Sequence, residues 1–518
     1  MIAAAAQYQP EQPDAPAIRR GGLMLRFFYL LSLFALLVQV LASCATARPS
    51  FNPSRKFGVT ELSQDFDLFQ NILEARHPSL YWYTSKSVID SAFRTTRLQL
   101  TDSLTEYGFR KMLQPVTALI NCGHTSVKIS KSYQAYLDQL PTQQVAAPFQ
   151  VKIWNDTAVF VASNKRKTAI SRGDMITTIN QKSIPYLLDT MRRYIPADGG
   201  NIVAKNQLLS FGFNFANFHR SLFGWQQQYA LTTVDSSGKK HNNIFSMVYA
   251  QRQREQKNRP SKKSMREKIS KKERLRQQRH LEIKDGYAVM TLNSFSEKLH
   301  LRRFLRQSFK TLQQQQVPAL VIDLRLNGGG RLSNFIFLAR HLIDHPYKIC
   351  DSLYTLSRKS PYDRYMKNHF LTRLQLRLST VKIDGKYHYR YFEKHIYPPK
   401  KRHHFDGDIY LLSSGFTASA STLTLSALKG QPNVTIVGEP SGGAAYGATA
   451  WIIPDITLPN TRLRLRLPLF RMVIDKDLPK NGQGVLPDVF AGPSVEAIRK
   501  GEDFKMNKVL ELISLRGR

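Results

Sequence analysis

Three observations along the chain predict an α/β fold. Between about 281 and 492, apolar strands alternate with helical stretches, a βαβ order typical of an α/β layer architecture. Residues 60–120 carry apolar side chains at helical spacing. From about 145 to 250 the pattern changes to short β-rich runs. The sequence therefore predicts an α/β core preceded by a helical domain and a β module.

The expected core, residues 281–505, contains the clearest elements. An apolar strand over 319–325 precedes a helix from about 331. A second strand over 408–413 precedes a helix from about 419, and a third strand follows at 435–438. Apolar runs of this length between helices are typical of strands buried on both faces of a sheet.

Two smaller units are expected before this core. In the helical domain, residues 57–130, apolar side chains recur every three or four positions: Leu62, Phe66, Phe69, Ile72 and Leu73. The β module, residues 145–250, has its β-rich runs at 158–162, 174–179 and 243–248. At 42% hydrophobic, 518 residues can bury cores of this number and size.

The chain is strongly basic, with 75 Lys and Arg against 38 Asp and Glu, a net charge of +37. Such a balance first suggests a polyanion partner. Residues 251–280 hold 13 of the basic residues against three glutamates, with almost no apolar residue and no aromatic one to stack on bases. We expect a solvated, disordered insertion there, attraction to anionic lipid headgroups as the alternative, and no specific nucleic-acid partner.

The N-terminus predicts a membrane-anchored protein. Residues 27–42 are a nearly continuous apolar run, short for a spanning helix and typical of a signal peptide. The run ends in Leu-Ala-Ser-Cys, which resembles the bacterial lipobox, whose cysteine becomes lipidated. We therefore predict a signal peptide and lipobox over 1–44 and lipidation of Cys44. An uncleaved anchor is the alternative, and Met24 is a second candidate start.

Three motifs carry potential chemistry. The strand at 319–325 runs into Gly328, Gly329 and Gly330, which let backbone N–H groups approach a ligand closely. Ser419 lies where the strand at 408–413 turns into a helix, and helix N-terminal N–H groups there can stabilise negative charge. His124 follows a glycine at a helix–strand junction. Each motif alone also fits a structural role: a turn, a helix cap or a packed histidine.

Together these motifs resemble the serine peptidase family of tail-specific (C-terminal processing) proteases and the tricorn protease core. The matching segments are Ile322–Gly330, Ser419-Ala420, Val437–Gly443, Gly484–Asp488, His77–Tyr81, Cys122–Thr125 and Arg172–Asn180. The resemblance implies a crotonase-like (ClpP/crotonase) α/β core with an N-terminal helical domain and a PDZ-like β module. The position of the base in lysine-dependent members is Ala444 here, so the chain resembles the histidine-dependent envelope branch.

The resemblance implies acyl transfer to peptide substrates, with Ser419 as nucleophile and His124 as base. The backbone N–H groups of Gly329 and Ala420 are the implied oxyanion hole. The residue orienting His124 stays open between Glu439, Asp475 and Asn481. Thr422 replaces the glutamate of the family's Ser-Ala-x-Glu motif.

The resulting hypothesis is a serine endopeptidase at the bacterial cell envelope, lipid-anchored to a membrane, with its catalytic part periplasmic or extracytoplasmic. We expect a peptide or protein substrate, no cofactor and no metal. One alternative is a non-catalytic peptide- or lipid-binding envelope protein on the same fold. A polyanion-binding envelope protein, which rests on the charge alone, is the other. The oligomeric state is not predicted.

Overall fold

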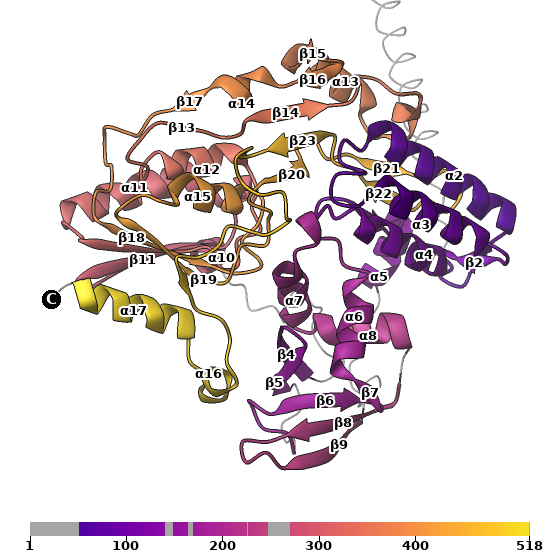
Figure 1. Ribbon diagram of the computed structural model, residues 1–518, viewed down its shortest axis with the longest axis horizontal. Coiled ribbons are helices and arrows are strands. Elements are labelled where there is room, and N and C mark those ends of the chain that lie inside the picture. The colour runs from indigo at the N-terminus through magenta and orange to yellow at the C-terminus, as the bar shows by residue number, and fades with distance from the viewer. Residues whose placement is uncertain (1–50, 140–148, 164–168, 225, 247–269, 517–518) are drawn as a thin grey trace, which may run out of the picture. The chain divides into compact units, whose positions relative to one another are not determined.

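The computed structural model describes residues 51–139, 149–163, 169–224, 226–246 and 270–516 (Figure 1). The chain divides into two units, Met1–Asn52 and Pro53–Arg518. All the described helices and strands belong to the second unit. The predicted signal segment with Cys44 and residues 251–269 of the basic insertion lie outside the described residues. In the described part of the chain, no helix combines the length and the apolar content that crossing a membrane requires.

A six-stranded sheet forms the centre of the core. Its order is β10-β11-β12-β18-β19-β24, and every neighbouring pair is parallel except β10–β11. The strands are β10 (Arg279–Lys284), β11 (Tyr287–Leu292), β12 (Ala319–Asp323), β18 (Asp408–Ser413), β19 (Val434–Gly438) and β24 (Val489–Phe490). The three core strands expected from the sequence are therefore present.

Helices cover both faces of this sheet, as Figure 1 shows. On one face, Leu320 and Ile322 of β12 share a core with α11 (Leu301–Gln314), α12 (Leu332–Ala339) and α15 (Ala420–Leu428). On the other face, Val321 packs with residues of α17 (Phe504–Arg516). Successive residues of a strand point to opposite faces, so a strand covered on both sides reads as a continuous apolar run.

A second, antiparallel sheet continues the core. Its order is β15-β16-β14-β23-β20. The strands are β15 (Val381–Ile383), β16 (Lys386–His388), β14 (Ser352–Thr355), β23 (Phe470–Val473) and β20 (Gly447–Ala450). Along the chain, helix α13 (His369–Ser379) lies between β14 and β15, and helix α14 (Arg390–Lys394) follows β16.

The N-terminal helices are α2 (Val59–Arg76), α3 (Lys86–Leu98) and α4 (Glu106–Leu119), as the apolar spacing predicts. Their buried residues join the hydrophobic core of the α/β unit. The strand that follows α4, β3 (Ser126–Lys128), pairs with β22 (Arg464–Arg466). The helical domain is thereby joined to the core by strand pairing as well as by packing.

The module between them contains more helix than the sequence analysis expects. Its sheet, in the order β4-β5-β6-β8-β9, has its own hydrophobic core. The strands are β4 (Phe149–Trp154), β5 (Thr157–Ser163), β6 (Met175–Ile179), β8 (Gln228–Val234) and β9 (Lys240–Ser246). Three helices pack on this sheet: α6 (Ile184–Arg192), α7 (Ile202–Ser210) and α8 (Asn214–Phe223). The predicted β-rich runs fall on strands of this sheet, and the three helices are additional to them.

The end of the basic insertion is also ordered, contrary to expectation. Residues Lys271–Gln278 form the helix α10, and β10 begins directly after it at Arg279. The Ser270 hydroxyl caps this helix by accepting a hydrogen bond from the Glu273 N–H at 3.1 Å. The prediction of disorder thus fails for 270–280.

Candidate active site

The loop after β12 is fixed to the strand–helix turn after β18 by hydrogen bonds. The Ser414 hydroxyl donates to the Arg325 carbonyl at 2.6 Å, and the Thr417 hydroxyl donates to the Leu324 carbonyl at 2.9 Å. The Ala418 N–H donates to the Asn327 carbonyl at 3.2 Å. The glycine loop and the serine turn therefore form one rigid unit.

Ser419 occupies the strained position of this turn. It is the N-cap residue of α15, with φ of 55° and ψ of −124°, a conformation that residues with side chains rarely adopt. Its hydroxyl makes no capping hydrogen bond, so the helix-cap role considered from the sequence does not describe this side chain. A strained residue whose hydroxyl is left out of the cap fits the position of a nucleophile.

Gly329 packs directly against this serine. Its φ is +95°, and a Cβ built on it would lie 2.7 Å from the Ser419 Cβ and 2.8 Å from the Ala418 carbonyl oxygen. No side chain can be accommodated at that distance. The glycine that the sequence analysis singled out is thus required by close approach to the nucleophile turn.

His124 lies on the short loop between α4 and β3. The loop is held by Thr125, which is buried and whose Oγ1 lies 2.8 Å from His77 Nε2. Because His77 Nδ1 accepts a hydrogen bond from the Ser79 N–H, Nε2 carries the proton and donates it to Thr125. Burial, with the Arg471 charge as a further cause, lowers the pKa of His77 to about 3, so this support stays neutral.

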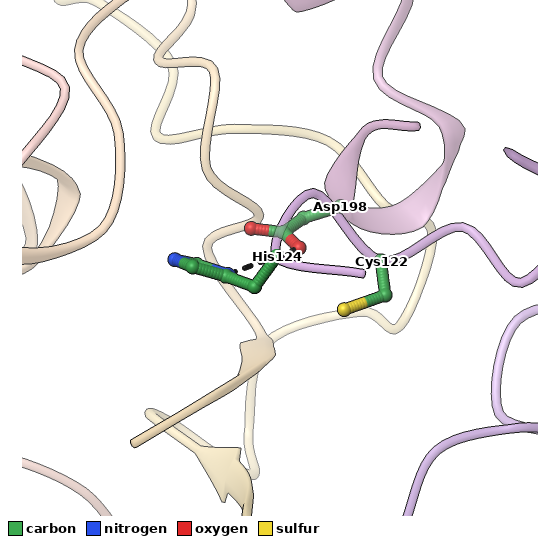
Figure 2. Close-up of side chains that lie close together, drawn as sticks. All are labelled: Cys122, His124 and Asp198. Carbon is green, nitrogen blue, oxygen red and sulfur yellow. Dashed lines mark ion pairs between the residues drawn. The ribbon is translucent and has the colours of Figure 1, made fainter. Parts of the chain in front are cut away.

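Asp198 is the acidic neighbour of His124. It begins the short 3-10 helix η1 (Asp198–Gly200), between α6 and α7 of the module. Its Oδ1 lies 3.9 Å from His124 Nδ1 (Figure 2). The same oxygen accepts a hydrogen bond from the Gly123 N–H at 2.7 Å. Burial raises the pKa of Asp198, and the His124 charge and the Gly123 N–H oppose that rise. No sequence motif pointed to this residue.

The three candidates for orienting His124, which are Glu439, Asp475 and Asn481, all make contacts elsewhere. Glu439 accepts a hydrogen bond from Lys505 Nζ at 2.7 Å, in a buried ion pair. Asp475 and Asn481 each accept a hydrogen bond from a nearby backbone N–H at 2.9 Å, in local turns. None of the three lines the cavity that contains His124.

One cavity of about 220 Å³ brings the site together. Ser419, His124 and Asp198 all line it, although they come from the core, the helical domain and the module. Most of its remaining wall is apolar, and the larger side chains are Leu332, Leu423, Trp451, Ile452, Ile453, Met472 and Ile474. A nucleophile, a base and a carboxylate around one hollow are the groups that acyl transfer needs.

Comparison with known proteins identifies the domain. Residues 286–490 match the model of peptidase family S41. The chain carries a peptidase family S41 domain. It is a serine-type peptidase. No curated protein matches the chain.

Two solved structures share the fold. Mature CPAF has 14% sequence identity and a TM-score of 0.60, over 89% of this chain and 99% of its own. Mature CPAF complexed with lactacystin has 13% identity and a TM-score of 0.60, over 88% and 98%. The likeness in fold therefore extends over more of the chain than the S41 domain alone.

The two backbone N–H groups predicted as oxyanion donors differ in their hydrogen bonding. The Gly329 N–H, one of the two predicted donors, donates to Asn327 Oδ1 at 3.0 Å. Within the described residues, the N–H groups of Ala420 and Gly330 donate no hydrogen bond. Gly330 and Ala420 also line the cavity that contains Ser419, whereas Gly329 does not. Two backbone N–H groups without a hydrogen bond in the described residues therefore belong to residues that line this cavity.

Thr422 takes the place of the glutamate in the family's Ser-Ala-x-Glu motif. Its hydroxyl donates to the Thr417 carbonyl at 3.1 Å, inside the serine turn. A Cβ built on Gly443 would lie 2.4 Å from Thr422 Oγ1, so the space around this side chain is filled. In place of a carboxylate, the chain therefore has a hydroxyl that is hydrogen-bonded and that stabilises the serine turn.

Cys122 is a third potential metal ligand beside His124 and Asp198. One ligand atom each from Cys122, His124 and Asp198 lie within 4.8 Å of one another (Figure 2). The Cys122 thiol donates to the Thr449 carbonyl at 3.6 Å, and burial raises its pKa to about 12. A metal ion would have to displace that proton and that hydrogen bond. A buried, protonated thiol also makes a poor nucleophile.

Proposed function

We propose that this protein is an endopeptidase that cleaves through an acyl-enzyme formed on Ser419. The Ser419 Oγ attacks the scissile carbonyl carbon while His124 accepts the hydroxyl proton. His124 then donates that proton to the leaving amine, and water releases the acyl group by the same steps in reverse order. The observation that supports this most strongly is the shared cavity of Ser419, His124 and Asp198.

Asp198 is proposed as the residue that orients His124. Its carboxylate faces Nδ1, which leaves Nε2 for the nucleophile. His124 Nδ1 is buried and makes no hydrogen bond within the described residues. At 3.9 Å the pair is longer than a hydrogen bond, and such contacts often shorten only when substrate binds.

The proposed oxyanion hole consists of the Ala420 and Gly330 N–H groups. Ala420 lies at the N-terminus of α15, where the helix dipole also favours negative charge. Removing one such donor costs about 2.7–4 kcal/mol of transition-state stabilisation in other enzymes. In this proposal the Gly329 N–H stays bonded to Asn327 and stabilises the loop, and the N–H of Gly330 contacts the oxyanion.

The walls of the cavity suggest the preferred substrate. Leu423, Met472 and Ile474 line it beside the catalytic groups. An unpaired charged side chain placed there would lose its hydration without a partner. We therefore expect an apolar residue next to the cleaved bond.

Labelling with a fluorophosphonate, which phosphonylates activated serines with loss of fluoride, tests the mechanism. Wild-type protein should be labelled at Ser419, while Ser419→Ala and His124→Ala should each lose labelling and peptide hydrolysis. Cys122→Ala is the matched control, since it changes a neighbouring side chain and should keep both. Labelling that persists in His124→Ala would overturn the proposed base.

The location is a separate proposal. The apolar run at 27–42 and the cysteine that follows it support a lipoprotein of the bacterial cell envelope, anchored through Cys44. Metabolic labelling with a palmitate analogue should mark wild-type protein, and Cys44→Ser should remain unlabelled. Incorporation that survives Cys44→Ser would rule out this anchor, whatever the peptidase assays show.

A further inference from the structure

Helix α13 exposes an unusually apolar surface. Leu376 is fully buried and packs the helix onto the core. On the exposed side, Leu371, Leu374 and Leu378 are 61%, 44% and 77% accessible to solvent, and Phe370 is 69% accessible. Residues three and four apart share one side of a helix, so these four side chains form a continuous stripe.

The stripe extends beyond the helix. Leu371, Leu374 and Leu378 line a shallow groove together with Tyr391 of α14, which is itself 56% exposed. Val381, at the start of β15, adds a further exposed apolar side chain. We call these six residues, from Phe370 to Tyr391, the α13 face. Contiguous apolar surface of this kind marks an interaction site.

Basic residues accompany the α13 face along the chain. Between 367 and 394 there are seven Lys or Arg against only Asp384 and Glu393. The basic residues are Lys367, Arg373, Arg377, Lys382, Lys386, Arg390 and Lys394. All of them except Arg390 are exposed, and Arg373 is already paired with Asp363 at 2.8 Å, so five exposed cations are left for a partner. A partner that fits this face should therefore offer an apolar region for the exposed side chains and negative charges for the basic residues beside them.

We propose that the α13 face binds the surface of an anionic lipid bilayer. A helix with exposed leucines and phenylalanine on one side and cations nearby is the type that lies in the headgroup region, with its apolar side chains below the phosphates. Each Lys or Arg near such a surface adds to the attraction. The proposal concerns a surface separate from the catalytic cavity and does not depend on the peptidase mechanism.

A second copy of the chain fits this face less well. Two α13 faces brought together would also bring together two sets of basic side chains, and repulsion between like charges opposes that contact. The chain as a whole has a net charge of +37, which adds to the repulsion. An anionic bilayer satisfies both the apolar stripe and the charge.

Vesicle binding tests the proposal on residues 53–518, which form a compact unit of their own and exclude the apolar run at 27–42. We expect sedimentation with vesicles of phosphatidylcholine and phosphatidylglycerol, and little with phosphatidylcholine alone. Leu374→Gln/Leu378→Gln should weaken binding about tenfold or more, because two apolar side chains no longer enter the bilayer. Arg377→Glu/Lys382→Glu should weaken it similarly and reduce its dependence on salt.

The double variant Leu98→Gln/Leu515→Gln is the matched control, since Leu98 and Leu515 are 77% and 60% exposed but lie on α3 and α17. It should bind vesicles like the wild type. Peptide hydrolysis and thermal unfolding verify that each variant is folded. Equal binding by wild type and Leu374→Gln/Leu378→Gln would overturn the proposal. So would a wild-type dimer that this variant converts to monomer, because the face would then be a contact between copies.

Discussion

Asp198 differs from the other acidic residues near the active site in facing His124. Replacing it with asparagine keeps the size of the side chain and an acceptor for the Gly123 N–H. The amide can instead present its N–H group to Nδ1, which favours the wrong tautomer of the base. We expect Asp198→Asn to lower kcat by about 10²- to 10⁴-fold, with little change in KM.

Asp475→Asn is the control for this prediction, because Asp475 accepts a hydrogen bond in a local turn and does not line the catalytic cavity. Its kcat should stay within about twofold of wild type. Steady-state kinetics on one peptide measure both variants. If Asp475→Asn causes the larger loss, Asp198 is not the orienting residue.

At the residue scale, the sequence points to the two residues of the proposed catalytic pair but not to the acidic residue beside them. Ser419 and His124 lie in motifs that can be recognised along the chain, and both line the cavity. Asp198 lies in an Asp-Gly-Gly turn of another module, and nothing in its local sequence sets it apart from other turns. Its role depends on how the module packs against the His124 loop, which no local pattern encodes.

At the element scale, the contact between the glycine loop and the serine turn controls the geometry of the site. A methyl group at position 329 would clash with the Ser419 Cβ at 2.7 Å and with the Ala420 nitrogen at 3.0 Å. We expect Gly329→Ala to lower kcat more than 100-fold, because moving the turn by about 1 Å disturbs nucleophile and oxyanion donor together. Hydrolysis assays with thermal unfolding measure the two effects separately.

The variant Gly430→Ala is the control for Gly329→Ala. It places an alanine in a left-handed backbone conformation without creating a steric clash. Gly430 ends the helix that Ser419 begins and has φ of +89°, close to that of Gly329, but a Cβ there would meet nothing within 4 Å. It should lose about 1–2 kcal/mol of stability and retain kcat. A similar fall of kcat in both variants would show that backbone strain, and not the contact, is responsible.

Sequence patterns predict elements well where burial is strong. The core strands are apolar runs buried on two faces, and their bounds agree with prediction within a few residues. Helix α6 was missed although Ile184, Leu187, Leu188 and Met191 are buried at helical spacing. Helix α10 has almost no apolar residue, so its sequence resembles a solvated segment and its order depends on the β strand that follows.

At the scale of the whole molecule, the module contributes to catalysis only if it stays docked on the core. Gly199, next to Asp198, touches Gly482 of the core so closely that a Cβ on Gly199 would lie 2.1 Å from the Gly482 Cα. We expect Gly199→Ala to displace Asp198 and lower kcat at least tenfold. Gly212→Ala is the matched control, because Gly212 also has a positive φ but meets nothing within 4 Å. Equal activity of the two variants would contradict this dependence.

Buried neutral histidines make the stability of the whole chain sensitive to acid. Burial lowers the pKa of His77 to about 3, and of His219 and His341 to about 4, from an ordinary value near 6.5. Above pH 6.5 these groups are neutral in both the folded and unfolded chain. Below pH 6.5 the histidines of the unfolded chain bind protons, while those of the folded chain stay neutral. The free energy of unfolding therefore falls as the pH falls.

Each such histidine contributes about 1.4 kcal/mol per pH unit between the two pKa values, so the three together lower the stability by up to about 4 kcal/mol per unit near pH 5. Urea unfolding from pH 7.5 to 4.5 measures this slope. His219→Phe should reduce it by about a third, because a phenyl ring keeps the packing against Tyr229 while removing one proton-binding group. Neither ring nitrogen of His219 makes a hydrogen bond within the described residues, so at pH 7.5 the variant should be at least as stable as wild type. An unchanged slope in His219→Phe would show that this histidine does not control the acid sensitivity.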